Sequence, residues 1–263
     1  MENEEYILPK VWSPETNPGG TWGSINQPTA GARFEKELPV GNKPLQLYSL
    51  ATPNGIKIGI MLEELLALGH KGAEYDAHTI NIGDGDQFSS GFVNINPNSK
   101  IPALVDNSVN PSIRIFESGS ILLYLAEKFN ALISNELHKR TECLNWLFWQ
   151  IGSAPYIGGG FGHFYKFAPI KIQYCIDRFT MELKRQLDVL DQQLAKYQYI
   201  SGNDYTIADI AIFPWYGHIA LDRSIYEAGE FLSIQDYPNL IRWAELIDQR
   251  DPVIKGRQVT AIS

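Results

Sequence analysis

Hydrophobic and polar residues follow two different periodicities along the first half of the chain, one typical of strands and one of helices. Residues 45–49, 75–80, 103–105 and 113–116 have the short apolar pattern of strands, and the last two are separated by an Asn- and Pro-containing turn. Apolar residues at spacings of three and four predict one helix over 58–68, stopped by Gly69, and another over 121–129. The order β-α-β followed by β-β-α predicts a thioredoxin-like α/β domain, with helices on the faces of a mixed sheet.

Strand signals disappear beyond about residue 135. One long helix is predicted by an apolar seam that steps by three and four, at Ile172, Ile176, Phe179, Leu183, Leu187, Leu190 and Leu194. Thr206 and Asp209 form the sequence signature of a capping box at a helix start. A last helix contains Trp243, and Pro252 is expected to end it. This half is therefore predicted to be all-α.

The first 44 residues have little periodicity and are rich in proline and glycine, which is typical of an extension without a core of its own. Trp12, Trp22 and Phe34 indicate that it packs on the rest of the molecule. The predicted organisation is an extension, a thioredoxin-like domain, and an all-helical C-terminal domain with a tail, over residues 1–44, 45–132 and 133–263.

Composition narrows the classes of partner. The 263 residues are 44% hydrophobic and 20% charged, as in an ordinary globular protein, and the net charge of −8 argues against nucleic acid or an anionic membrane as a partner. No apolar run is long enough to span a membrane, and the acidic start Met1-Glu2-Asn3-Glu4-Glu5 is no signal peptide. The expected location is the cytoplasm.

The two cysteines, Cys143 and Cys175, both fall inside helical patterns and form no C-x-x-C pair. A structural disulfide is not expected in a reducing compartment, and small core or interface side chains are the simpler interpretation. The five histidines show no i, i+4 pair, so no metal site is expected. Any thiol chemistry would then use a thiol brought by a ligand.

The most informative segment covers residues 99–126. Ile101-Pro102 precedes a short apolar strand, a place where proline suits a cis peptide bond and where the backbone of Ile101 would be free to pair with an extended peptide. Ser118 follows another strand and opens a helix, whose free N–H groups and dipole favour a carboxylate. Together these features predict a cleft for a short peptide that carries a carboxylate.

That arrangement resembles the glutathione site of the thioredoxin-fold glutathione transferases. Three further stretches are similar to the bacterial Nu class of this family: T-P-N-G from Thr52, G-D-G-D-Q-F from Gly83 and W-L-F-W from Trp146. The Nu class contains glutathione-dependent disulfide-bond oxidoreductases, and one of its subgroups has an N-terminal extension. The resemblance implies the fold of a glutathione transferase, a homodimer, and one or two glutathione molecules per site. It also implies that bound glutathione reduces small disulfides.

Within that resemblance, Thr52 and Asn54 are the expected catalytic residues. The Thr52 hydroxyl and the Asn54 N–H, at a helix start, can both donate to the glutathione thiolate. Lowering a thiol pKa near 8.5 by ~2 units requires about 2.7 kcal/mol of preferential thiolate stabilisation, which two or three charge-assisted hydrogen bonds can supply. The alternative for this tripeptide is a simple helix-capping turn.

The remaining expected contacts follow from the chemistry of glutathione. Glu117 and Ser118 can meet the ammonium and the carboxylate of the γ-glutamyl end, and Lys100 can face the glycine carboxylate. The full set implied to bind glutathione is Asn26, Thr52, Pro53, Asn54, Gln87, Lys100, Ile101, Glu117, Ser118 and Arg178. Of these, the resemblance alone brings in Asn26, Gln87 and Arg178.

One position departs from the class. A second-glutathione contact by Gln at position 151 is expected, whereas this chain has Gln150-Ile151, and adjacent helical residues point about 100° apart.

Two other functions stay open on the sequence alone. The same site could conjugate glutathione to electrophiles, or the fold could serve as a binding or scaffold protein.

Overall fold

The computed structural model describes residues 7–13, 20 and 22–262; the acidic start of the chain lies outside them. Its first half contains η1 (Gly23–Ile25), β1 (Leu45–Ser49), α1 (Pro53–Ala67), β2 (Tyr75–Thr79), η2 (Asp86–Phe88), α2 (Ser90–Ile95), β3 (Ala103–Asp106), β4 (Ile113–Phe116) and α3 (Ser118–Phe129). Its second half contains α4 (Leu137–Pro155), η3 (Tyr156–Phe167), α5 (Gln173–Leu194), α6 (Ile207–Ile212), η4 (Phe213–Gly217), α7 (His218–Ala220), α8 (Gly229–Leu232), η5 (Ile234–Asp236), α9 (Pro238–Asp248) and α10 (Asp251–Gly256).

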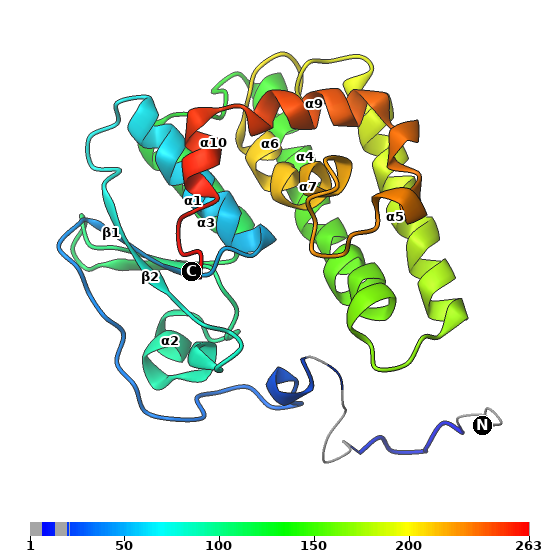
Figure 1. The fold of residues 1–263 in the computed structure, drawn as a ribbon. Coiled ribbons are helices and arrows are strands. Elements are labelled where there is room, and N and C mark those ends of the chain that lie inside the picture. Colours follow the sequence, from blue (N-terminus) through cyan, green and yellow to red (C-terminus); the bar gives the residue numbers. More distant parts are fainter. Residues whose placement is uncertain (1–6, 14–19, 21, 263) are drawn as a thin grey trace.

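A four-stranded mixed sheet in the order β2-β1-β3-β4 organises the first half. β1 pairs in parallel with β2 and antiparallel with β3, and β3 pairs antiparallel with β4. All five residues of β1 are buried, as expected for a central strand covered on both faces. Helices α1 and α3 cover one face of the sheet and α2 lies on the other (Figure 1).

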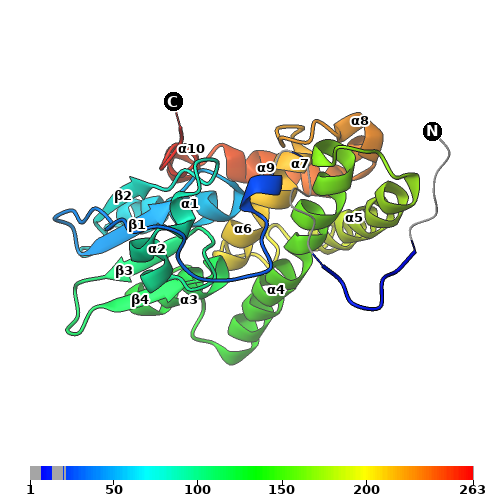
Figure 2. The same ribbon diagram turned by 90° about the horizontal axis from the view of Figure 1, so that it is seen from below.

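The second half is a helical bundle beside the sheet, with α4 and α5 as its long members (Figure 2). Its core includes Trp243 and Tyr216, which are among the largest fully buried side chains. η3 and η4 are wound as π-helices, and both lie on the side of the bundle that meets the site described below. The C-terminal helix α10 returns to pack along α1 (Figure 1).

The strands and long helices agree with the predicted pattern, including the capping box of Thr206 and Asp209. Pro252 is the exception. It lies in the first turn of α10, where proline is well tolerated, and does not end the helix that contains Trp243. The domain divisions at residues 44 and 132 stay predictions.

The extension contacts the body at some of the expected aromatic residues. The Trp22 ring packs edge-on against Phe167 at 6.0 Å, and the C=O of Phe34 accepts a hydrogen bond from the N–H of Ser90 at 2.9 Å. Trp12, in contrast, keeps 63% of its surface exposed. No helix in the described part of the chain is long and apolar enough to cross a membrane.

Candidate active site

The site begins at the N-terminus of α1, where Thr52 is the N-cap residue. Its C=O accepts a hydrogen bond from the Ile56 N–H at 2.8 Å, but its hydroxyl makes no capping hydrogen bond. Pro53 occupies the first helical position, where it needs no N–H partner, and the N–H of Asn54 finds no acceptor among the described residues. Within the described residues, a hydroxyl and an N–H without hydrogen-bond partners therefore stand together at the positive end of a helix.

The side chain of Asn54 is oriented from the other half of the molecule. The indole N–H of Trp215, on η4, donates to Asn54 Oδ1 at 2.9 Å. An indole nitrogen can only donate, so this contact settles which end of the amide is the oxygen. The NH₂ group of Asn54 then points away from Trp215, and Asn54 lines both of the recesses described below.

The first recess adjoins the segment before β3. It holds about 180 Å³ and is lined by Asn54, Asn98, Lys100, Ile101, Pro102, Glu117 and Ser118. The Ile101-Pro102 bond is cis, as the sequence predicts. In the part of the chain that the structure describes, neither the N–H nor the C=O of Ile101 has a hydrogen-bond partner, so both are available to an extended peptide.

Glu117 and Ser118 connect β4 to α3 at the back of this recess. Glu117 has a φ of +69°, an uncommon conformation outside glycine, and its carboxylate accepts a hydrogen bond from Asn98 Nδ2 at 3.3 Å. Glu117 rather than Ser118 is the N-cap residue of α3. The hydroxyl of Ser118 is thus not used for capping and can take part in ligand binding.

A second recess of about 230 Å³ adjoins the first, because the two share Asn54, Glu117 and Ser118. It lies between the two halves of the chain, and its further lining residues are Lys57, Ile151, Ala154, Pro155, Gly158, Gly159 and Trp215. A peptide bound in the first recess would therefore lie next to a space that a second molecule can enter.

Lys57 is a site residue that sequence reasoning missed. Its side chain is fully buried, and Nζ lies 3.1 Å from Ser118 Oγ and 2.7 Å from Gln150 Oε1. Burial lowers the pKa of the Lys57 ammonium to about 7, against an opposing effect of the Glu117 carboxylate. The available signal was a lysine inside the apolar run from Ile56 to Leu62, all of which is buried.

The departure at position 151 has a clear structural meaning. Ile151 lines the second recess, whereas Gln150 turns inward and is fully buried against Lys57. The buried Nε2 of Gln150 has no partner among the described residues. The two adjacent side chains therefore point in different directions, and an isoleucine faces the recess.

Five predicted site residues are not among those that line the two recesses: Asn26, Thr52, Pro53, Gln87 and Arg178. Thr52 and Pro53 lie at the start of α1, directly before the lining residue Asn54. Asn26 is exposed directly after η1, and Arg178 is exposed on α5. Gln87 is buried in η2, where its Nε2 donates to the C=O of Ile82 at 3.4 Å while Oε1 lacks a partner in the described chain. Their roles in ligand binding stay predictions.

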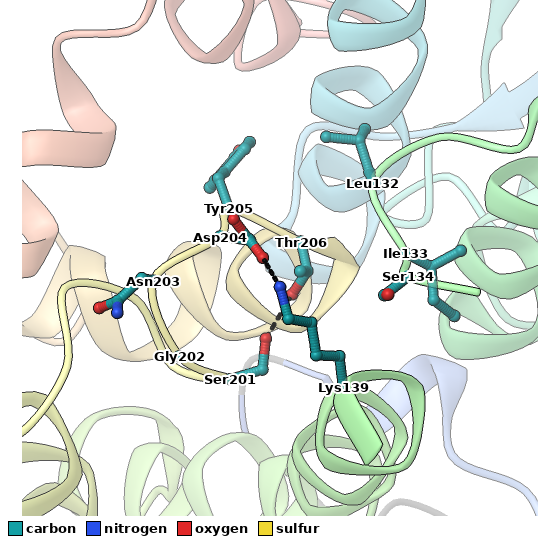
Figure 3. Close-up of a pocket in the computed structure, with 10 residues that line it drawn as sticks. All are labelled: Leu132, Ile133, Ser134, Lys139, Ser201, Gly202, Asn203, Asp204, Tyr205 and Thr206. Atoms are coloured by element: carbon teal, nitrogen blue, oxygen red, sulfur yellow. Dashed lines mark hydrogen bonds and ion pairs between the residues drawn. The ribbon is translucent and has the colours of Figure 1, made fainter. Parts of the chain in front are cut away.

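A larger cavity of about 570 Å³ lies elsewhere, between α4 and the loop before α6 (Figure 3). Two pairs of its polar groups bond to each other, Lys139 with Asp204 at 3.1 Å and Ser201 with Thr206 at 3.0 Å, while the buried Tyr205 hydroxyl has no partner among the described residues. The Lys139–Asp204 pair is solvent-exposed and carries little energy. Among the described residues, the region at the start of α1 instead combines the unpaired N–H of Asn54 with the free backbone N–H and C=O of Ile101.

Neither cysteine forms a disulfide, and neither lines the two recesses; Cys143 is buried on α4, and Cys175 is half-buried on α5. Burial raises the pKa of the Cys143 thiol, which disfavours its reactive form. Among the described residues, no group of three or more His, Cys, Asp and Glu could hold a metal ion.

Both halves of the chain match models of one protein family. Residues 43–127 match the glutathione S-transferase N-terminal domain, and residues 173–246 match the glutathione S-transferase C-terminal domain. The disulfide-bond oxidoreductase YghU of Escherichia coli is 60% identical over 98% of this chain and 90% of its own length.

Two solved structures extend the comparison. Glutathione transferase YghU from Streptococcus pneumoniae, complexed with glutathione, has a TM-score of 0.96 at 55% identity and covers 98% of this chain and 100% of its own. A glutathione transferase from Burkholderia graminis, with two glutathione molecules bound per subunit, has a TM-score of 0.75 at 40% identity. It covers 82% of this chain and 88% of its own.

Proposed function

This chain belongs to the glutathione S-transferase family, and we propose that it is an enzyme that reduces small disulfides with bound glutathione. The observation that carries the proposal is the pair of unused donors at the start of α1, the Thr52 hydroxyl and the Asn54 N–H. They stand beside a recess with a free peptide edge at Ile101, while both cysteines lie elsewhere. The site is built to hold a thiolate that the protein does not itself contain.

In the proposed reaction, the thiolate of one glutathione, stabilised by Thr52 and Asn54, attacks a sulfur of the substrate disulfide. The S–S bond breaks, the departing thiolate takes a proton, and a mixed disulfide with glutathione remains. A second glutathione thiolate then attacks this mixed disulfide through the second recess and yields glutathione disulfide and the second substrate thiol. One disulfide and two glutathiones thus give two thiols and one oxidised glutathione, with no protein cysteine involved.

We place the bound tripeptide along the first recess. Its backbone pairs with Ile101, its γ-glutamyl end meets Glu117 and Ser118, and its glycine carboxylate faces Lys100. Pro53 shapes the turn that brings Thr52 to the sulfur. Asn26, Gln87 and Arg178 are proposed as outer contacts. The proposed assembly is a homodimer in the cytoplasm, a compartment that suits two unpaired cysteines.

The deciding assay compares two substrates at equal glutathione concentration. Bis-hydroxyethyl disulfide reports disulfide reduction, and chlorodinitrobenzene reports conjugation to an electrophile. We expect the kcat/KM for the disulfide to dominate. A dominant conjugation rate would instead assign the chain to the transferase reaction, and binding of glutathione without turnover of either substrate would favour a scaffold role.

Replacing Cys143 and Cys175 together by alanine tests where the thiol comes from. Because neither cysteine lines a recess, we expect kcat and KM for bis-hydroxyethyl disulfide to stay within about twofold of the unmodified protein. Circular dichroism and the unfolding midpoint serve as controls, since Cys143 is buried. Loss of turnover in a folded double variant would assign the reactive thiol to the protein.

Replacing Trp215 by phenylalanine tests the bond that orients Asn54. The ring is largely kept but the donor is lost, so we expect kcat to fall by up to about tenfold, the effect of one neutral hydrogen bond. The same substitution in an Asn54→Ala background should have almost no further effect on kcat, because the partner is already gone. Equal losses in both backgrounds would mean that Trp215 acts by packing alone.

A further inference from the structure

The buried side chain of Lys57 ends in a small polar cluster beneath the place where both recesses meet. Its Nζ has Ser118 Oγ at 3.1 Å and Gln150 Oε1 at 2.7 Å, and Lys57 itself lines the second recess. The amide nitrogen of Gln150 is also buried there without a partner among the described residues. This cluster contains more hydrogen-bond donors than acceptors, so an anion could accept from the donors that are left over.

The direction of the Lys57–Ser118 hydrogen bond depends on the charge of the lysine. A neutral amine has a lone pair and can accept the Ser118 O–H, whereas an ammonium has three N–H donors and no acceptor. Once Nζ is protonated, Ser118 Oγ must therefore accept from it. The hydroxyl hydrogen is then released to donate elsewhere, and Ser118 lines both recesses.

Building on the proposed function, we infer that glutathione binding is coupled to the uptake of a proton by Lys57, which turns the Ser118 hydroxyl toward the γ-glutamyl carboxylate. Lys57 is thus a positioning residue that acts through Ser118. The proton comes from solvent and stays on Nζ while the ligand is bound. The carboxylate gains an oriented donor and a nearby positive charge in one step.

The surroundings of Lys57 place this step near neutral pH. α3 and α4 present Ser118 and Gln150 to Nζ, both uncharged, and in the described chain Glu117 is the charged side chain whose field reaches Nζ. Burial brings the pKa of Lys57 down to about 7 without ligand. A carboxylate within about 4–6 Å raises the pKa of a neighbouring cation by about one to three units. Binding therefore moves Lys57 from partly to fully protonated.

Calorimetry with S-methylglutathione measures this proton directly. The methyl group removes the thiol, whose own ionisation would otherwise release a proton. Binding enthalpies are compared in buffers of different ionisation enthalpy, and their slope gives the number of protons taken up. With a shift of about two units, we expect about 0.7 proton at pH 7.5 and about 0.1 at pH 6.0, where Lys57 is already charged.

Two variants and one control identify the group that titrates. Lys57→Met keeps the length of the side chain and should abolish the uptake at pH 7.5 while weakening binding about tenfold. Gln150→Met removes an acceptor from the ammonium, so the uptake should move to lower pH and increase at pH 6.0. Lys100→Met, at an exposed lysine of the same site, should weaken binding and leave the uptake at about 0.7 proton.

The results separate a failure of the Lys57 coupling from a failure of the proposed function. Equal uptake at both pH values in the unmodified protein, or uptake that survives Lys57→Met, overturns the coupling while the glutathione site stands. If Lys57→Met does not fold, the unmodified protein and Gln150→Met still decide. A protein that binds neither glutathione nor S-methylglutathione overturns the proposed function itself.

Discussion

Thr52→Ala is expected to slow the reduction of bis-hydroxyethyl disulfide at pH 6.5 by about 5- to 50-fold. A hydrogen bond to a charged group contributes about 1.5–3 kcal/mol, so its loss raises the pKa of bound glutathione by about one to two units. If the pKa is about 6.5 in the unmodified enzyme, that shift removes most of the thiolate at this pH. The measurement is the pH dependence of kcat, whose acid limb should move upward by the same one to two units.

The Thr52 hydroxyl makes no capping hydrogen bond, so the substitution should leave stability nearly unchanged. Thr52→Ser is the matched control, because it keeps the hydroxyl and should retain a pH profile close to that of the unmodified enzyme. The affinity for S-methylglutathione should change little in either variant. An unshifted acid limb in Thr52→Ala would contradict the role given to this residue.

Asp209→Ala is expected to lower the free energy of unfolding by about 3–5 kcal/mol. The Asp209 carboxylate is fully buried and accepts from the N–H groups of Ile200, Thr206 and Trp243 at 2.9, 3.0 and 2.9 Å. Alanine would leave three buried donors without an acceptor, each costing about 1–3 kcal/mol before relaxation. Burial raises the pKa of Asp209 to about 6, so urea unfolding at pH 7.5 tests the ionised form.

Asp204→Ala provides a nearby comparison. The side chain of Asp204 is 69% exposed, and its ion-pair partner in the described part of the chain is the exposed Lys139 at 3.1 Å. Surface ion pairs contribute about 0–1 kcal/mol, so its removal should barely shift the unfolding curve. If the two aspartates proved equally costly, or equally harmless, burial would not be the reason that Asp209 matters.

The sequence was informative where structure depends on neighbouring residues. The strands of the sheet were predicted from short apolar runs, and the capping box was predicted from Thr206 and Asp209, which lie three positions apart. Thr52, Asn54, Glu117 and Ser118 were predicted to lie at helix starts, which have local signatures, and the structure has them there; their roles stay predictions. Pro252 shows the limit of this reasoning, since a proline that can end one helix can equally begin the next.

The missing part of the site depends on contacts between distant positions. Lys57 reaches Ser118 and Gln150, which are 61 and 93 positions away, and Trp215 reaches Asn54 across 161 positions. No periodicity in the sequence encodes such pairs. The buried lysine was visible only as a charge in an apolar run, which local reasoning treats as a helix surface position.

Gly159 gives the second recess an adjustable size. It lines that space on η3, and a Cβ built on it would meet no atom within 4 Å. A methyl group can therefore be added at this one position without displacing the protein around it, and it would reduce the free volume of the recess. Evolution or a protein engineer could narrow the range of substrates at this position, which lies on η3, without altering α1, where the proposed thiolate donors lie.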